Sequence, residues 1–495
     1  RHWLQSRIDT VIAGTVTLED IRLSLIAPRL ELAGVTLYDP QGTKVAGVDR
    51  FSITLRWLPL LRREVRITNI DLKTPWADLI QDKAAGLNLM AAVAVSDSQK
   101  ADAAPSKEGG GLPVNIVCDA LHLSGGRLSF KTADGGIKVE LDDLSLLGAG
   151  NLGAKRAELS LDATRIDYQS NAIHLPQTHL AIEASMDGDR LELITLRIIA
   201  GNTTADLQGS AMALTAQPVV DASLDIQSEL AEIANVLAIA GDYSGKITAG
   251  LTFKGPVINP AATLDLKMDQ GLLAGRQVDG LRLLLNLEDR LATISDTALE
   301  LAGGTIGLDA TVNLKGAFPS DLLTPPADLN ALAYTLDLDF DIPELAPWVE
   351  PQAEIGGTLD GKAHLKGTGI NPSAMAARLT LDAKGKHLSA PKTAIRPMDA
   401  NLNLTARLEQ GMAIIDRLAA ATRGLNLTGT GRLGLQAKDL LADLKVDATD
   451  LAPVLALAGV EAARGTVDAA LHARGSLERP QLALNLTAAD LSAGA

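Results

Sequence analysis

The chain has 495 residues, an apolar share of 46% and a formal net charge of −15. An acidic chain is unsuited to nucleic acid, whose phosphates need a basic protein face, so we expect no nucleic-acid partner. Cys118 is the only cysteine, which excludes an internal disulfide and a thiolate metal site.

The first part of the chain, residues 1–95, mixes alternating apolar segments with short helical patterns. We predict a cap domain of the α+β class here, with short helices at 58–64 and 75–86. Residues 96–112 are small and polar and include three consecutive glycines. That composition is typical of a flexible linker or exposed loop.

From residue 113 to residue 495 the commonest pattern is alternation with a period of two. In the segment 334–342, Leu336, Leu338 and Phe340 alternate with threonine and aspartate. One apolar and one polar side predict a half-buried β-strand. Gly, Asn, Asp and Pro separate such segments at short intervals, which predicts antiparallel hairpins.

A motif recurs three times in this body, beginning at Gly245, Gly357 and Gly465. It consists of a glycine, nine residues, a second glycine, four residues and a proline. Glycine tolerates positive φ and proline lacks an N–H, so the motif predicts a hairpin corner and no catalytic loop. Short helices are expected before the copies, at 228–241, 343–349 and 449–459. The resulting repeat units lie near 228–341, 342–447 and 448–495, the last of them incomplete.

The apolar side of so much sheet must be covered, and the few short helices are too small to cover it. One solution is a string of separate β-sandwiches, whose cores usually recruit more aromatic residues than this body has. The other is one sheet that curls, so that its apolar face lines a trough. We predict the second: a mainly β fold with an elongated, curled antiparallel sheet, a repeating β-groove, and a few short helices.

Motifs of known chemistry are absent or fail in context. Residues 148–153 match the dinucleotide-binding spacing of glycines, but an alternating segment follows instead of a helix. Residues 356–363 approach a P-loop, but Ala363 stands where a Ser or Thr would bind Mg²⁺. His174 and His179 have no acidic ligand at helical spacing, which favours a surface pair over a metal site. We therefore predict no enzyme, no catalytic residue, no cofactor and no metal.

Several segments resemble a known family. Residues 30–75 and 121–147 resemble the opening domain of AsmA-like proteins. So does the segment 84–93, "AAGLNLMAAV", which is similar to their glycine-x-Asn-Leu signature. Residues 450–486 resemble the repeat of the TamB branch, the inner-membrane component of the translocation and assembly module.

The resemblance implies a bridge-like lipid carrier of the periplasm, anchored to the inner membrane in the full-length protein by an N-terminal helix. Its long groove would shelter the acyl chains of phospholipids between the inner and outer membranes. It further implies an outer-membrane β-barrel as a partner. We expect the chain to be a fragment that lacks both the anchor and the C-terminal domain of the family.

Alternating apolar positions of the body are the candidate groove lining. Each CH₂ group kept from water is worth about 0.8 kcal/mol, so a lipid tail needs an apolar path across an aqueous gap. Each position is alternatively an ordinary core residue. The alternative functions are an assembly scaffold or chaperone for outer-membrane β-barrel proteins, acting by strand addition, and a polysaccharide-active enzyme. The candidate lining residues are Leu264, Leu266, Met268, Leu283, Leu285, Leu287, Leu336, Leu338, Phe340, Leu379, Leu381, Leu402, Leu404, Leu482, Leu484 and Leu486.

Overall fold

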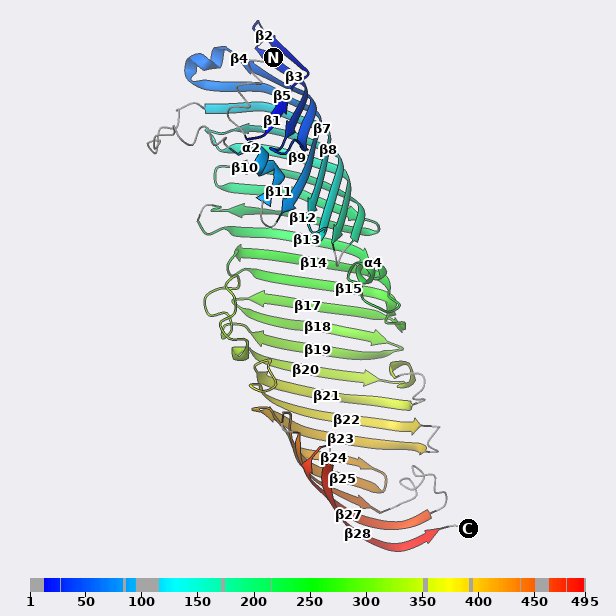
Figure 1. Cartoon of the computed structure of the whole chain (residues 1–495). Coiled ribbons are helices and arrows are strands. Elements are labelled where there is room, and N and C mark those ends of the chain that lie inside the picture. Colours follow the sequence, from blue (N-terminus) through cyan, green and yellow to red (C-terminus); the bar gives the residue numbers. More distant parts are fainter. Residues whose placement is uncertain are drawn as a thin grey trace. The chain divides into compact units, whose positions relative to one another are not determined.

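The fold is mainly β, as Figure 1 shows. Residue contacts divide the chain into unit 1 (Arg1–Ala240 with Thr252–Val257) and unit 2 (Gly241–Leu251 with Ile258–Ala495). Two α-helices and three 3-10 helices accompany 28 strands in the described part of the chain. The computed structural model describes residues 13–26, 28–82, 86–94, 115–170, 174–214, 216–349, 355–390, 395–436, 438–449, 463–477 and 479–493.

The sheet of unit 1 follows the chain with one exception. β1 and β2 lie one after the other along β3, and each later strand pairs with the one before it, except that β7 pairs with β5 in parallel. The other pairs are antiparallel. The strands are β1 (Thr15–Thr17), β2 (Asp20–Ser24), β3 (Arg29–Tyr38), β4 (Lys44–Arg56), β5 (Glu64–Asp82), β6 (Gly86–Leu87), β7 (Asn115–Thr132), β8 (Ile137–Asn151), β9 (Arg156–Ser170), β10 (His174–Asp187), β11 (Arg190–Ala200), β12 (Thr203–Met212) and β13 (Val219–Glu229).

The glycine-x-Asn-Leu segment returns the chain after β5. Asn88 begins helix α2 (Asn88–Val93), and its Nδ2 donates to the carbonyl oxygen of Asp78 at 2.9 Å. The N–H of Ile80 donates to Asn88 Oδ1, also at 2.9 Å. Because an asparagine amide both donates and accepts, one side chain ties the helix to the backbone of β5. Gly86 has φ +78°, which glycine adopts without strain.

Two of the predicted helices near the N-terminus have different outcomes. Residues 58–64 contain the 3-10 helix η1 (Leu58–Arg62), as expected. The helix predicted at 75–86 is wrong, because β5 continues to Asp82 and pairs with both β4 and β7. Pairing on both sides outweighs the local helical pattern of that segment. The predicted linker 96–112 lies outside the described residues, and the predicted domain boundaries stay predictions.

Helix α4 (Leu230–Val236) lies within the predicted helical segment 228–241. It follows β13 directly and lies beside the turn that joins β11 to β12. Glu232 accepts hydrogen bonds from the N–H of Asn202 (2.9 Å) and from Thr203 Oγ1 (2.8 Å). These bonds stabilise the carboxylate and lower the pKa of Glu232. The side chain therefore holds α4 against the turn between β11 and β12.

Unit 2 is one antiparallel sheet in chain order, with the short β16 attached to β15. Its 3-10 helices are η2 (Leu329–Ala331) and η3 (Ala346–Trp348), and η3 lies within the helical segment predicted at 343–349. The helix predicted at 449–459 falls on residues 450–462, which lie outside the described residues. The strands are β14 (Ser244–Pro256), which contains residues of both units, and β15 (Ala261–Leu273), β16 (Arg276–Val278), β17 (Gly280–Glu288), β18 (Leu291–Leu301), β19 (Gly304–Asn313), β20 (Ala333–Ile342), β21 (Gly356–Thr368), β22 (Ala376–Ala390), β23 (Ile395–Glu409), β24 (Met412–Thr422), β25 (Leu425–Gly434), β26 (Asp439–Ala448), β27 (Ala463–Ser476) and β28 (Arg479–Ala493).

The first glycine of each motif lies at the start of β14, β21 and β27. Gly245, Gly357 and Gly465 have φ values of +118°, +113° and +145°, which side chains rarely permit. At Gly357 and Gly465 the register to the next strand shifts, as at a β-bulge. The motif thus marks a structural corner of the sheet.

The predicted fold class is confirmed: the chain is mainly β, with curled antiparallel sheet and few short helices. In each unit the strands make their extensive contacts with neighbours in the same sheet. The string of separate sandwiches is therefore wrong. Among the described strand pairs, β5–β7 is the parallel one, and such a pair needs a long connection, which the residues between these strands are numerous enough to provide.

We expect Gly357→Ala to destabilise unit 2 by about 1–3 kcal/mol because alanine strains the positive φ. A Cβ at this position would also lie 2.8 Å from the carbonyl oxygens of Lys386 and His387. Thermal unfolding followed by circular dichroism measures the change. Gly275→Ala is the control, since Gly275 also has a positive φ (+79°) but a Cβ there would meet only the Asp242 side chain, at 3.9 Å. Equal losses in the two variants would contradict a special requirement at the corner.

We expect Glu232→Gln to lower the stability of unit 1 at neutral pH and to leave it unchanged in acid. The pKa of Glu232 is depressed in the folded state, so its contribution is full above the unfolded value of about 4.3 and is lost as the pH falls through the folded value. Unfolding measured across this range should show the wild type converging on the variant. A constant gap at every pH would contradict this account.

Candidate functional site

The candidate lining residues of β15 and β17 lie on one face of the sheet. Leu264 is paired directly with Leu285, and Leu266 with Leu283. Directly opposed residues of neighbouring strands project to the same side of the sheet. Alternation along each strand then places Met268 and Leu287 on this side as well.

The same face continues from β19 to β28 without interruption. Phe340 and Leu336 flank Leu338 on it, and Leu402 lies opposite Ala383. Leu379 is paired with Leu365, while Leu482 and Leu486 are paired with alanines of β27. All sixteen predicted positions therefore share one face, which we call the apolar face of unit 2. Its central row of directly paired residues is Leu308, Leu338, Ala363, Leu381, Leu404, Leu418, Gly429, Leu444, Leu471 and Leu484.

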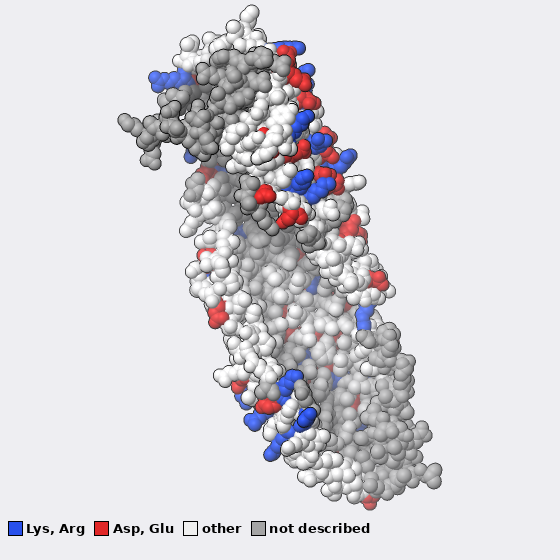
Figure 2. All heavy atoms as spheres, viewed as in Figure 1, with Lys and Arg blue, Asp and Glu red and all other residues white. Residues whose placement is uncertain are grey.

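The apolar face of unit 2 is only partly shielded from solvent. Most of the predicted positions are half-buried, which is low burial for leucines inside a protein. Met268 is the exception at 2% exposed, and Leu482, Leu484 and Leu486 on β28 are 61–64% exposed. Figure 2 shows a hollow over the strands of this unit whose floor is mostly uncharged. The face thus lines an open furrow with no second layer of described residues packed on it.

The opposite face of unit 2 is polar. Asp337 lies between Asp309 and His364, and Lys362 lies opposite Asp382. His364 Nδ1 is 2.6 Å from Asp337 Oδ1. Such exposed pairs add little stability, but they keep this side of the sheet in water. The two faces therefore differ as sharply as the alternation in the sequence predicts.

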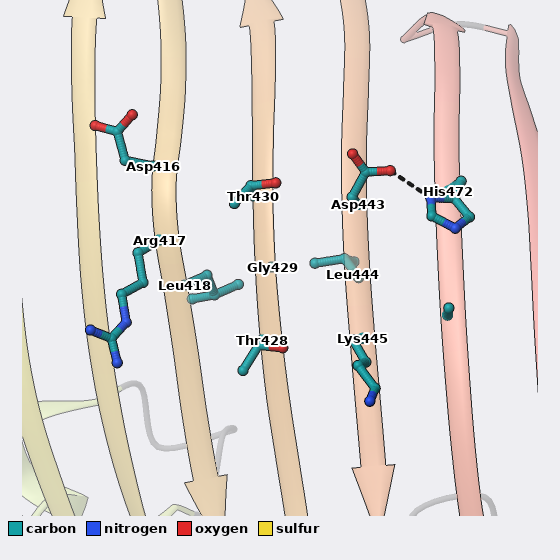
Figure 3. Close-up of a pocket in the computed structure, with 11 residues that line it drawn as sticks. Asp416, Arg417, Leu418, Thr428, Gly429, Thr430, Asp443, Leu444, Lys445 and His472 are labelled. Carbon is teal, nitrogen blue, oxygen red and sulfur yellow. Dashed lines mark hydrogen bonds and ion pairs between the residues drawn. The ribbon is translucent and has the colours of Figure 1, made fainter.

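A shallow pocket of about 440 Å³ lies between β24 and β27, and Figure 3 shows its lining, which combines polar side chains with Leu418, Gly429 and Leu444 of the central row. His472 Nδ1 is 2.5 Å from Asp443 Oδ1, and Arg417 and Lys445 also line the pocket. The register that pairs Asp443 with His472 repeats the pairing of Asp337 with His364 one repeat earlier. The pocket therefore reflects a repeated cross-strand pair.

The remaining motifs of the sequence lie in ordinary sheet. Residues 148–153 end β8 and enter a turn before β9, and residues 356–363 lie within β21. His179 Nε2 is 2.8 Å from Asp162 Oδ2, while the side chain of His174 lies outside the described residues. Within the described ranges, no cluster of three or more His, Cys, Asp or Glu side chains is arranged to hold a metal ion.

The sequence reasoning missed a second apolar face, in unit 1. Cys118, paired with Ile67 and Gly150, has a pKa raised chiefly by burial. The alternation in β7, β8 and β9 is the signal that could have found this face. Its central row of directly paired residues is Leu32, Phe51, Leu72, Leu123, Leu146, Leu161, Ile182, Leu196, Leu207 and Leu224.

Each unit is thus a strand-rich sheet with an apolar face and a charged face, which defines a class of groove-forming β proteins. Residues 15–190 match the model of the AsmA family, which supports an AsmA-like assignment for this chain. Comparison with the curated proteins gives no match, and neither does comparison with the solved structures. Among the described residues, none of the helices has the length and apolar character that a bilayer crossing requires.

We expect Leu338→Asp to leave unit 2 folded, with a loss of about 1–2 kcal/mol, because Leu338 is half-buried on an open face. Met268→Asp should cost several kcal/mol, because it places a charge at a site that is 2% exposed. Chemical denaturation followed by circular dichroism compares the two. Comparable global unfolding would mean that Leu338 is an ordinary core residue.

Proposed function

We propose that the protein is a bridge-like lipid carrier in which the apolar face of each unit shields the acyl chains of phospholipids. The observation that supports this most directly is the unbroken central row of unit 2, where apolar side chains or glycine occupy every paired position from β19 to β28. A sheet built only for its own stability would bury such a row against another layer. Here the row stays accessible.

The energetics favour transfer over tight binding. Removing one CH₂ group from water is worth about 0.8 kcal/mol, so a tail of sixteen carbons exposed to water would face a barrier of roughly 12 kcal/mol. Leucine and alanine side chains offer dispersion contacts that are individually small and similar at each step. Acyl chains can therefore exchange from one position to the next without leaving a deep energy minimum. The headgroup would stay in water at the open side of the furrow.

The proposed setting follows from the family match. The AsmA-like assignment supports a role at the cell envelope, and we propose the periplasm as the location, with attachment to the inner membrane in the full-length protein. The TamB branch and an outer-membrane β-barrel partner belong to the same proposal. An acidic chain with a polar outer face suits an aqueous compartment.

A photo-cross-linking amino acid at Leu338 should capture phospholipid when the protein is purified from cells and the adducts are identified by mass spectrometry. The matched control places the same group at Asp339, the next residue of β20, which faces the opposite side of the sheet. Leu404 and Asn403 on β23 form a second pair of this kind. We expect lipid adducts at the two leucine positions and not at their neighbours.

Two results would overturn the proposal. One is equal capture on both faces, which would indicate non-specific contact. The other is capture of unfolded barrel strands in place of lipid, which would favour the assembly scaffold. Organic extracts of the unmodified protein should also contain phospholipid in stoichiometric amounts, and Leu338→Asp should reduce that amount while the β circular dichroism remains.

A further inference from the structure

Unit 1 carries a cluster of exposed apolar side chains that the groove does not use. Leu25 and Ile26 form the turn after β2, and Trp57, Leu58 and Leu61 belong to the segment around η1. We call these five residues the apolar tip. Ile26 is 99% exposed, Leu61 86% and Leu58 79%. Large side chains exposed together on a soluble surface mark a site of interaction.

The two segments of the apolar tip are held together. Trp57 Nε1 donates to the carbonyl oxygen of Leu25 at 3.2 Å. The N–H of Leu55 donates to the carbonyl oxygen of Pro28 at 2.8 Å, just below the tip. η1 ends at Arg63, whose φ of +57° turns the chain into β5. The tip is thus an ordered surface and not two separate loop ends.

Positive charge surrounds the apolar tip. Arg56, Arg62 and Arg63 are exposed, and no ion pair of theirs is found with any carboxylate of the described chain. Two further arginines lie nearby and are already paired, Arg22 with Asp20 at 3.0 Å and Arg29 with Glu31 at 3.9 Å. Most of the chain is acidic, so three exposed arginines without such partners are a local departure. A partner of complementary charge would therefore be anionic.

The apolar tip also adjoins the start of the apolar face of unit 1. Leu23 on β2 is exposed and is paired with Leu30, which is paired in turn with Ile53. Ile53 is paired with Ile70, so the row continues into β5. Among the described strands, β2 pairs with β3 alone, so the row begins at an edge strand of the described sheet. The tip therefore lies beside the strand at which the row begins.

We propose that the apolar tip inserts into the interfacial layer of an anionic phospholipid bilayer. Tryptophan and leucine side chains suit the boundary between headgroups and acyl chains, and arginine suits the headgroup phosphates. A basic segment beside an apolar one is attracted to anionic lipid more strongly than to neutral lipid. Docking in this orientation would place the edge strand β2 against the bilayer surface. The proposal does not depend on lipid carriage, because it concerns binding of the protein to a membrane.

Flotation of the protein with vesicles tests the proposal. The vesicles contain phosphatidylcholine alone or phosphatidylcholine with phosphatidylglycerol. Leu58→Asp with Leu61→Asp should weaken binding to the anionic vesicles at least about tenfold, since two leucine side chains lose their apolar contact. The matched control is Leu237→Asp with Ile239→Asp, two exposed positions that follow α4 at the other ends of the strands. The control should bind as the wild type does.

The charge requirement has its own variant. Replacing Arg56, Arg62 and Arg63 with glutamine should reduce binding to the anionic vesicles to the level of the neutral ones. Circular dichroism confirms that each variant is folded. Equal binding of the tip variant and its control would overturn the proposal. So would a wild type that self-associates without vesicles and a tip variant that is monomeric, because the tip would then be a contact between copies of the chain.

Vesicle binding and lipid carriage can fail separately. If the protein does not float with vesicles but phospholipid is still cross-linked at Leu338, the membrane-insertion proposal fails and the lipid-carrier proposal stands. Flotation that depends on the tip, with no lipid captured on the apolar face, would do the reverse.

Discussion

The fold depends on keeping one face of the sheet apolar through every strand pair. Directly opposed residues share a face. A slip of one residue between any two strands would therefore expose leucine side chains to solvent and point charged side chains into the furrow. The paired rows of both units show no such slip. The constraint is global, although each pair enforces it locally.

β-bulges threaten this constraint because an extra residue reverses the alternation along a strand. In β18 the apolar face passes from Ile294 to Thr297, and the register shifts against both neighbours at that point. In β11 the register shifts against both neighbours between Leu193 and Leu196. In β24 it shifts against both neighbours at Ile415. The register shifts at the bulge against the strand on either side. The two neighbouring strands therefore keep their apolar residues on a common face. Each bulge also increases the local twist, which helps the sheet to curl.

The sequence was informative where alternation was regular. The segments around Leu266, Leu338 and Leu404 alternate cleanly, and the structure places them on one face. Strands with a bulge, such as β18 and β24, break the period of two and were not recognised as lining. Residues 75–82 have a helical pattern, but residues 76–81 pair with β7 and residues 75–77 also pair with β4, a tertiary effect that no local window contains. The apolar tip could not be inferred at all, because exposure of Leu58 and Leu61 depends on what does not pack against them.

The number of strands in the repeat unit is even. Six strands, β21 to β26, separate the corner at Gly357 from the corner at Gly465. An even count returns the chain to the same direction, so both corners lie at the same margin of the sheet. Gain or loss of one whole repeat would change the length of the sheet by roughly 29 Å, at about 4.8 Å per strand. Every later corner would stay at the same margin of the sheet. An odd count would exchange the margins of all that follows, so natural variation in length should come in even numbers of strands.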